Sequence, residues 1–341
     1  MNAREEQSAH PSALVMDMLF GFQVSHALCA AARLGVADLL KDGGKTVDEL
    51  AAATDTKAPL LYRLLRALAG VGVFAEQASG EFVLTPLAVP LQRDAPEGSV
   101  HGYAVMVGER FMQEPWQELL NAVRTGEVAF ERTYGTPLFD WLATHREADA
   151  MFNDAMTSHT SREADAVVAA YDFGEFKTIV DVAGGHGSLL ARILAANPSA
   201  RGVLFEQPHV VDGAVALLQQ AGLGERSSTV AGSIFESVPA GGDLYILKRI
   251  LHDWDDELSR VILENCRRAM NVGGRVLVVD QVIPPGNDPH VGKFHDLSMM
   301  VMLGAQERTR EQFAALLLSA GLRLTRVVTL PTIGLVEAVA A

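Results

Sequence analysis

The chain has 341 residues, of which 49% are hydrophobic, so it can bury a full core and has the length of about two domains. Its 28 Lys and Arg against 42 Asp and Glu give a net charge of −14, which argues against a nucleic acid or an anionic membrane as partner. The two cysteines, Cys29 and Cys266, have no metal-ligand spacing, so neither a metal site nor a disulfide framework is expected.

The N-terminal residues are polar and lack the basic and apolar parts of a signal peptide. No apolar stretch approaches about 18 residues without a charge, which is the length that a membrane helix needs. We therefore expect a cytoplasmic protein with no membrane partner.

Residues 1–100 predict a winged-helix domain. The expected elements are a long apolar helix, a short helix, a leucine-striped helix and a β-hairpin, over residues 14–40, 46–53, 58–71 and 73–84. Thr46 and Glu49 form a capping box that marks the start of the second helix. The long helix and the winged helix carry more apolar surface than a domain of this size needs to fold alone, so we expect a homodimer.

Residues 101–170 continue as mainly helical sequence, and the pattern changes near residue 171. From there, β-rich runs alternate with helical periods, which predicts an α/β fold with a mostly parallel sheet covered on both faces. The expected strands are 178–183, 202–205, 243–247, 275–282, 322–328 and 335–339, and the expected helices are 188–196, 209–221, 256–270 and 310–320. Only residues 329–334 separate the last two strands, so these should pair antiparallel.

A glycine-rich turn at Gly184, Gly185 and Gly187 joins the first of these strands to a helix. Such a turn lets the backbone approach a ligand, but the glycine spacing does not satisfy the dinucleotide fingerprint in any register. Glu206, at the end of the next strand, is placed to accept both hydroxyls of a ribose. Asp181, on the strand before the turn, is placed to meet an ammonium group. A ligand with a ribose and an amino-acid head but no pyrophosphate is S-adenosylmethionine.

Several ordered motifs resemble the small-molecule O-methyltransferases, a family that includes plant caffeic acid methyltransferase and bacterial polyketide and phenazine methyltransferases. The motifs are Asp181–Gly187, Leu204–Val211, Leu247–Trp254 and Glu307–Thr309, with Leu61–Leu68 and Phe82–Ala88 resembling the family's dimerisation domain. The resemblance covers nearly the whole chain. It implies a Rossmann-like seven-stranded sheet with an antiparallel last strand. The implied domains are a winged-helix dimerisation domain at 1–100, a helical region at 101–170 that contributes to both pockets, and a catalytic domain at 171–341.

The resemblance also implies roles for individual residues. Besides the turn and Glu206, cofactor contacts fall on Ser233, Ile234 and Lys248, and Phe152 and Met156 match a segment that closes over the cofactor. His252 matches the general base, and Asp280 and Glu307 match the carboxylates that flank it. There are three departures from the family pattern: Ala183 for a glycine, Ser233 for an aspartate, and Asp280 for a glutamate.

The position of His252 agrees with that role. It follows a strand at the carboxyl end, where doubly wound sheets bind ligands, and an imidazole with a pKa near ~6.5 can take the proton of a phenol whose pKa is near ~10. Asp253 is adjacent in sequence and tends to point elsewhere, so it is assigned to the substrate side. The acceptor pocket is further expected to involve Met106, Phe111, Asp296, Met299 and Met300, because methionines adapt to flat aromatic molecules.

The expected function is S-adenosylmethionine-dependent O-methylation of a small aromatic or polyketide-type acceptor. Three alternatives remain open: non-methylating chemistry such as hydroxylation or a pericyclic reaction, N- or C-methylation, and a winged-helix regulator that senses S-adenosylmethionine. Residues 58–71 hold only Arg63 and Arg66 as cations, which disfavours the regulator.

Overall fold

A computed structural model describes residues 10–95 and 98–341, with the side chains of residues 157–162, 209 and 212 excepted. The chain divides into two compact units. One comprises residues up to 113 together with 147–159, and the other comprises residues 114–146 together with 160–341. The three-part division expected from the sequence is a division by role and stays a prediction.

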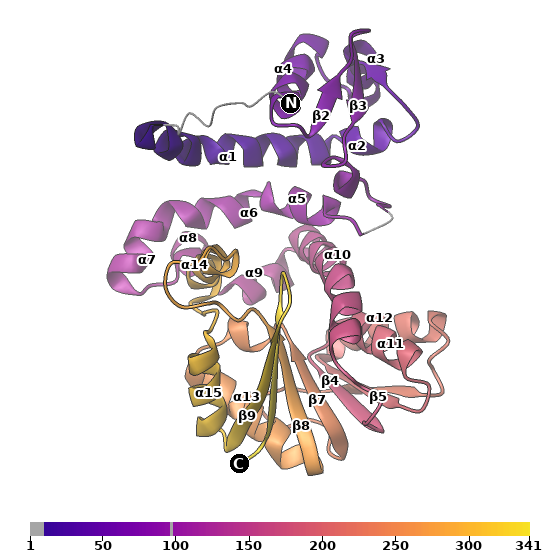
Figure 1. Cartoon of the computed structure of the whole chain (residues 1–341), viewed down its shortest axis with the longest axis vertical. Helices are drawn as coiled ribbons and strands as arrows, with labels where there is room; N and C mark the ends of the chain where they lie inside the picture. The colour runs from indigo at the N-terminus through magenta and orange to yellow at the C-terminus, as the bar shows by residue number, and fades with distance from the viewer. Residues whose placement is uncertain (1–9, 96–97) are drawn as a thin grey trace, which may run out of the picture. The chain divides into compact units, whose positions relative to one another are not determined.

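The first unit is a winged-helix domain (Figure 1). It contains α1 (Pro11–Arg33), α2 (Val36–Leu39), β1 (Lys45–Thr46), α3 (Val47–Thr54), α4 (Ala58–Gly70), β2 (Phe74–Glu76), β3 (Glu81–Leu84), η1 (Val89–Leu91), α5 (His101–Val107), α6 (Arg110–Gln113) and the first part of α10 (Arg146–Ala170). The three strands pair antiparallel in the order β1-β3-β2. The capping box predicted at Thr46 and Glu49 is present at the start of α3.

The prediction of one long helix over residues 14–40 is wrong at its C-terminal end. Gly35 adopts a left-handed conformation with φ 67°, which ends α1 at Arg33 and starts the short helix α2. Glycine takes this conformation without the penalty that a Cβ imposes, so the break is encoded in one residue. By length and composition α1 could cross a membrane, a test that the buried core helix of a soluble protein and a signal sequence also pass.

The second unit holds a seven-stranded sheet in the order β6-β5-β4-β7-β8-β10-β9. Its helices before the sheet are η2 (Glu114–Glu118), α7 (Leu119–Thr125), α8 (Ala129–Tyr134), α9 (Leu138–Thr144) and the rest of α10. The sheet and its connections are β4 (Thr178–Val182), α11 (Ser188–Ala196), β5 (Arg201–Glu206), α12 (Pro208–Gln220), β6 (Ser227–Ala231), β7 (Gly242–Lys248), η3 (Leu251–Asp253), α13 (Asp256–Ala269), β8 (Met270–Asp280), α14 (Gly292–Leu303), α15 (Arg310–Ser319), β9 (Leu322–Thr329) and β10 (Gly334–Ala340).

The strand directions confirm the predicted Rossmann-like sheet. The pairs from β6 through β8 are parallel, and the last strand, β10, runs antiparallel to both β8 and β9. β6 is absent from the strand ranges read from the sequence. It is an edge strand with the polar, mostly exposed sequence Ser-Ser-Thr-Val-Ala, so it lacks the apolar run of a buried strand.

Alternate residues of the central strands face two separate cores. Ile179 of β4 packs with the side chains of α11 and α12, whereas Val180 packs on the other side with those of α13 and α15. Figure 1 shows these two helix pairs on opposite faces of the sheet. Because β4 lies between β5 and β7, the chain reverses its direction of growth there, and doubly wound sheets bind ligands at such a switch point.

Candidate active site

The turn after β4 depends on its glycines. Gly187 has φ 81° and caps α11, and a Cβ at Gly184 would come within 2.5 Å of the Asp181 carboxylate and 2.6 Å of a Leu204 methyl carbon. Only glycine therefore fits at 184 without moving the strand end. Ala183, the departure from the family pattern, adopts φ 54°, a left-handed conformation that costs an alanine roughly 1–2 kcal/mol.

Glu206 is held beside this turn by two backbone hydrogen bonds. Its Oε2 accepts the N–H of Gly185 at 2.9 Å, and its Oε1 accepts the N–H of Gln207 at 2.7 Å. The side chain is buried, so its rotamer is fixed before any ligand arrives. Contact of this fixed carboxylate with ribose hydroxyls stays a prediction.

Asp181 is a buried carboxyl group at the end of β4. Neither of its oxygens makes a hydrogen bond of ordinary geometry to a described residue. Burial raises the pKa of Asp181 to about 7, although Lys248 opposes this rise. A buried carboxylate is expensive unless a cation or a donor meets it. The ammonium group of S-adenosylmethionine is such a cation, so the residues around the turn fit this cofactor.

Lys248, at the end of β7, already has a partner. Its Nζ lies 3.0 Å from Oε2 of Glu163. The same carboxylate accepts two hydrogen bonds from the Arg249 guanidinium, at 3.1 Å on Oε2 and 2.5 Å on Oε1. Burial lowers the pKa of Lys248, and Glu163 opposes this. Ser233 and Ile234 follow β6, and the Ile234 carbonyl accepts the side-chain amide of Asn265 at 2.7 Å. Cofactor contact by these three residues stays a prediction.

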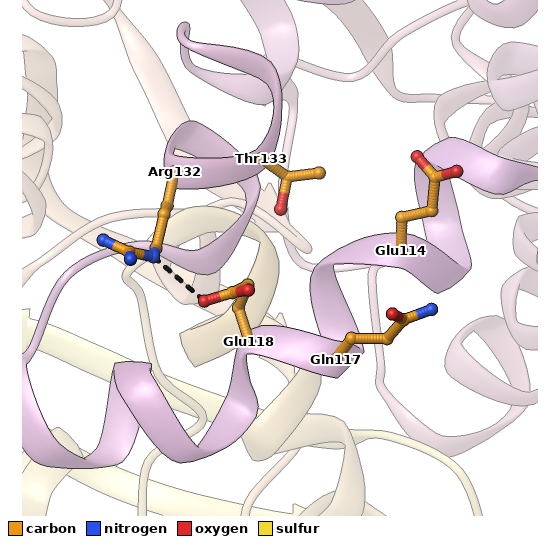
Figure 2. Close-up of a pocket in the computed structure, with 5 residues that line it drawn as sticks. All are labelled: Glu114, Gln117, Glu118, Arg132 and Thr133. Atoms are coloured by element: carbon orange, nitrogen blue, oxygen red, sulfur yellow. Dashed lines mark hydrogen bonds and ion pairs between the residues drawn. The ribbon is translucent and has the colours of Figure 1, made fainter.

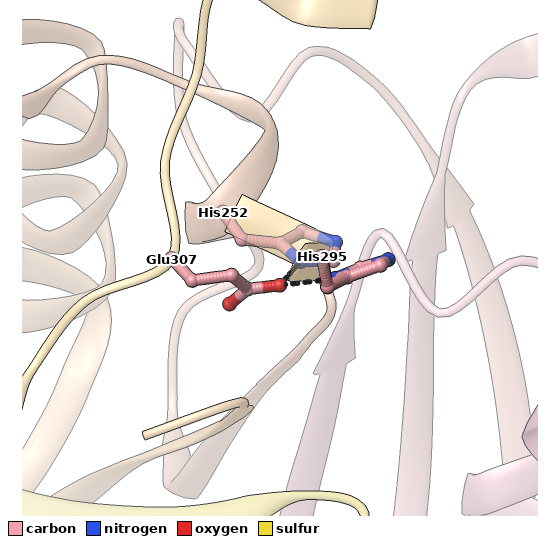
Figure 3. A group of neighbouring side chains, drawn as sticks. All are labelled: His252, His295 and Glu307. Carbon is pink, nitrogen blue, oxygen red and sulfur yellow. Dashed lines mark hydrogen bonds and ion pairs between the residues drawn. The ribbon is translucent and has the colours of Figure 1, made fainter. Parts of the chain in front are cut away.

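His252 lies in η3, directly after β7. Its Nδ1 is 2.9 Å from Oε1 of Glu307 (Figure 3). Its Nε2 is 3.4 Å from Oδ1 of Asp253. Burial lowers the pKa of His252, but Asp253, Asp280 and Glu307 raise it more, to about 9. The pKa of His252 is therefore higher than the value of ~6.5 that was expected from the sequence.

The two flanking carboxylates differ in what they do. Burial raises the pKa of Glu307, but the hydrogen bonds from His252 and His295 outweigh this effect and bring the pKa down to about 2. Asp280 is buried with both oxygens lacking a hydrogen bond to the described residues, and burial raises its pKa. Of the two, Glu307 makes the hydrogen bond that orients the His252 ring, while Asp280 acts on the pKa of His252 through its charge.

Two residues outside the predicted set complete this centre. His295 of α14 places Nδ1 2.6 Å from the same Glu307 oxygen. Arg308 is buried and donates to the Leu251 and Trp254 carbonyls at 2.6 and 2.9 Å, on either side of His252. Asp296 accepts the backbone N–H of Glu307 at 2.8 Å, a positioning contact where the sequence predicted substrate binding.

His252, His295 and Glu307 also bring three potential metal-ligand atoms within 4.8 Å of one another. Their separations of 2.6 and 2.9 Å are those of hydrogen bonds. Two ligands on one tetrahedral zinc ion stand roughly 3.3 Å apart. The geometry therefore fits one carboxylate oxygen hydrogen-bonded to two imidazole rings better than a metal centre.

The remaining predicted residues lie in both units. Met299 and Met300 are half-buried on α14 in the second unit. Met106 and Phe111 are buried within the first unit, to which Phe152 and Met156 also belong. The described part of the second unit also contains a polar hollow of about 660 Å³ (Figure 2). It is lined by Glu114, Gln117, Glu118, Arg132 and Thr133, none of which was predicted to bind a ligand.

Comparison with known proteins identifies the family. Residues 116–323 match the O-methyltransferase domain, and residues 16–93 match the O-methyltransferase dimerisation domain. A phenazine O-methyltransferase of Lysobacter antibioticus is 49% identical over 94% of this chain and 93% of its own length. A phenazine-1-carboxylate N-methyltransferase of Pseudomonas aeruginosa is 32% identical over 93% of each chain.

Similarity to a solved structure supports the same family assignment. A methyltransferase of calicheamicin biosynthesis, in its S-adenosylhomocysteine-bound form, is 36% identical with a TM-score of 0.86, over 97% of this chain and 98% of that one. The orphaned carboxylate at the glycine turn, the matched domains and these relatives agree on one conclusion. The chain belongs to the O-methyltransferase family and is a methyltransferase that uses S-adenosylmethionine.

Proposed function

We propose that this enzyme methylates a hydroxyl group of a small fused-ring aromatic acceptor, with a hydroxyphenazine as the first compound to test. The supporting observation is the hydrogen bond from His252 Nδ1 to the buried Glu307, which leaves Nε2 as the basic nitrogen. The phenazine class is suggested by the relative that is 49% identical.

The chain's residues divide the work between the ends of three strands, β4, β5 and β7. Glu206 and Asp181 hold the ribose and the ammonium group, and the Gly184–Gly187 turn brings the backbone close to the ligand. When bound, S-adenosylmethionine supplies an activated methyl group on its sulfonium sulfur. His252 takes the hydroxyl proton as the oxygen attacks in line, and Glu307 stabilises the imidazolium that results.

The ring can act in this way only in its neutral form. With a pKa of about 9 before the acceptor binds, His252 is mostly an imidazolium at neutral pH. The reactive complex is either a phenol beside a neutral ring or a phenolate beside an imidazolium, and these two forms have the same number of protons. The imidazolium enzyme and a neutral phenol together carry one proton more. That proton must be lost before reaction, so the enzyme should favour mildly alkaline conditions or an acidic hydroxyl.

The test is His252→Ala, assayed on a hydroxyphenazine and on an acceptor that is already ionised at pH 7. Turnover on the neutral acceptor should fall by roughly 10²–10⁴-fold and recover as pH rises, while turnover on the ionised acceptor should change little. Exposed His145 provides the control, and His145→Ala should behave as the parent enzyme. Equal loss on both acceptors at every pH would mean that His252 holds the substrate and is not a base.

N-methylation is the second candidate, because the Pseudomonas relative is an N-methyltransferase. A ring nitrogen attacks through its lone pair and has no proton to lose first. Product analysis by mass spectrometry and NMR on one phenazine that bears both a hydroxyl and a free ring nitrogen separates the two reactions. Methyl on nitrogen, with a rate unaffected by His252→Ala, would overturn O-methylation.

We also propose that the chain forms a homodimer in the cytoplasm through the matched dimerisation domain. Large apolar side chains of α1 are exposed, namely Leu14, Val15, Met16, Met18, Leu19, Phe20, Phe22 and Val24. A second copy placed on this helix would bury them by a two-fold interface, so no membrane is needed to cover α1.

A further inference from the structure

One oxygen atom of Glu307 serves two imidazole rings from different elements. His252 of η3 reaches it at 2.9 Å and His295 of α14 at 2.6 Å, each through Nδ1. The two ring centroids are 5.7 Å apart and the rings are inclined by 39° (Figure 3). The sequence drew attention to His252 alone as the base, and nothing in the methyl transfer described above uses His295.

The shared oxygen fixes the tautomer of both rings. Glu307 remains ionised because the hydrogen bonds that it receives lower its pKa to about 2. An ionised carboxylate only accepts hydrogen bonds, so both Nδ1 atoms must donate. His252 therefore presents Nε2 as its basic nitrogen whenever the ring is neutral.

Helix α14 holds Glu307 at two points. Asp296 accepts the backbone N–H of Glu307 at 2.8 Å, and His295 donates to the carboxylate. The other carboxylate oxygen, Oε2, is buried and makes no hydrogen bond to the described residues. Without His295, the hydrogen bond to His252 would be the one remaining hydrogen bond to the carboxylate among the described residues.

Sharing the oxygen also changes the electrostatics of His252. The titratable and charged groups around this ring are Asp253 on its own turn, Asp280 from β8, Glu307 and Arg308 before α15, His295 and Asp296 on α14, and Arg249 after β7. Most of them are acidic and favour the imidazolium. A carboxylate oxygen that already accepts one hydrogen bond stabilises a second donor less, so His295 opposes them.

We propose that His295 is a positioning residue that fixes the Glu307 carboxylate and, by sharing its oxygen, lowers the proton affinity of His252. This inference rests on the proposed role of His252 as the base. Its consequence is that His295 sets the pH above which the neutral ring is available to a hydroxyl acceptor.

The experiment compares His295→Leu with His295→Asn. Leucine removes the donor, while the asparagine amide nitrogen occupies nearly the place of Nδ1 and keeps it. For His295→Leu, the rising limb of kcat/KM against pH on a hydroxyphenazine should move up by roughly one pH unit, which is about a tenfold loss at neutral pH. His295→Asn should retain the parent profile, and both variants should bind S-adenosylhomocysteine as the parent does.

A second readout does not depend on turnover. The NMR titration of the His252 ring in the protein without acceptor should show the same upward shift in His295→Leu and none in His295→Asn. Equal loss at every pH with an unshifted titration would overturn the proposal, as would an asparagine variant that behaves like leucine. If His252→Ala retained full activity, the proposed function would fail, yet the NMR titration would still decide whether His295 acts on His252.

Discussion

Replacing Arg308 by methionine should destabilise the catalytic unit strongly, although Arg308 need touch neither substrate nor cofactor. The guanidinium is buried and donates to two backbone carbonyls, Leu251 at 2.6 Å and Trp254 at 2.9 Å. These carbonyls flank the turn that carries His252. Methionine fills much of the same volume, so the effect reports on polar contacts more than on a cavity.

The magnitude follows from the separate contacts. A hydrogen bond from a charged donor contributes about 1.5–3 kcal/mol, and two carbonyls lose such a bond. The ion pair with Asp256 adds at most about 1 kcal/mol, because that carboxylate is 67% exposed and screened by water. These contributions add up to a loss of about 3–7 kcal/mol, a large part of the 5–15 kcal/mol that is typical of whole domains.

Urea denaturation followed by tryptophan fluorescence measures this loss. Arg260→Met is the matched control, since that arginine is 38% exposed and pairs with Glu264 one helical turn away, a contact worth about 0.3–0.5 kcal/mol. Arg308→Lys keeps the charge and should lie between the two. If Arg308→Met and Arg260→Met lost the same free energy of unfolding, the carbonyl contacts would contribute nothing and the reasoning would be refuted.

Three further outcomes are expected. Glu206→Ala should weaken S-adenosylhomocysteine binding by about 2–3 kcal/mol, roughly 30–150-fold by calorimetry, while exposed Glu225→Ala should leave it unchanged; equal affinities would remove Glu206 from the cofactor site. The rate on a neutral hydroxyl acceptor should rise between pH 7 and about 9, because the raised pKa of His252 must be passed before the ring can accept a proton, and a flat profile would contradict this. Leu19→Glu on α1 should dissociate a dimer in sedimentation experiments, whereas Leu318→Glu, equally exposed on α15, should not; a parent chain that sediments as a monomer would rule out the dimer.

The parts that the sequence predicted well are those set by local pattern. The glycine turn, the capping box at Thr46 and the alternation of strands and helices each depend on residues that are neighbours in the chain. Their conformations follow from short-range sterics and hydrogen bonding, so one sequence is enough. The prediction failed locally where one residue outweighed the pattern, as at Gly35, or where an edge strand lacked an apolar run, as at β6.

The catalytic centre was predictable only in part, because its contacts join distant residues. Periodicity marks neither His295 nor Arg308, which reach residues 12 and 57 positions away. The motif Glu307-Arg308-Thr309 contains Arg308, but no role was predicted for it from the sequence, and its burial and its carbonyl contacts appear only in the structure. For His295 the sequence offered only its adjacency to Asp296, and deciding its role required the position of α14.

The place of β4 between β5 and β7 has a consequence for how this enzyme could change. Asp181, Glu206 and His252 stand at or just beyond the ends of neighbouring strands of the sheet, whereas Met299 and Met300, two of the methionines expected to meet the acceptor, lie on α14. Substitutions at those two methionines can therefore reshape the acceptor side, whereas His295 and Asp296 of the same helix must stay to hold Glu307. Variation of Met299 and Met300 is accordingly where a search for altered acceptor range, by selection or in the laboratory, should begin.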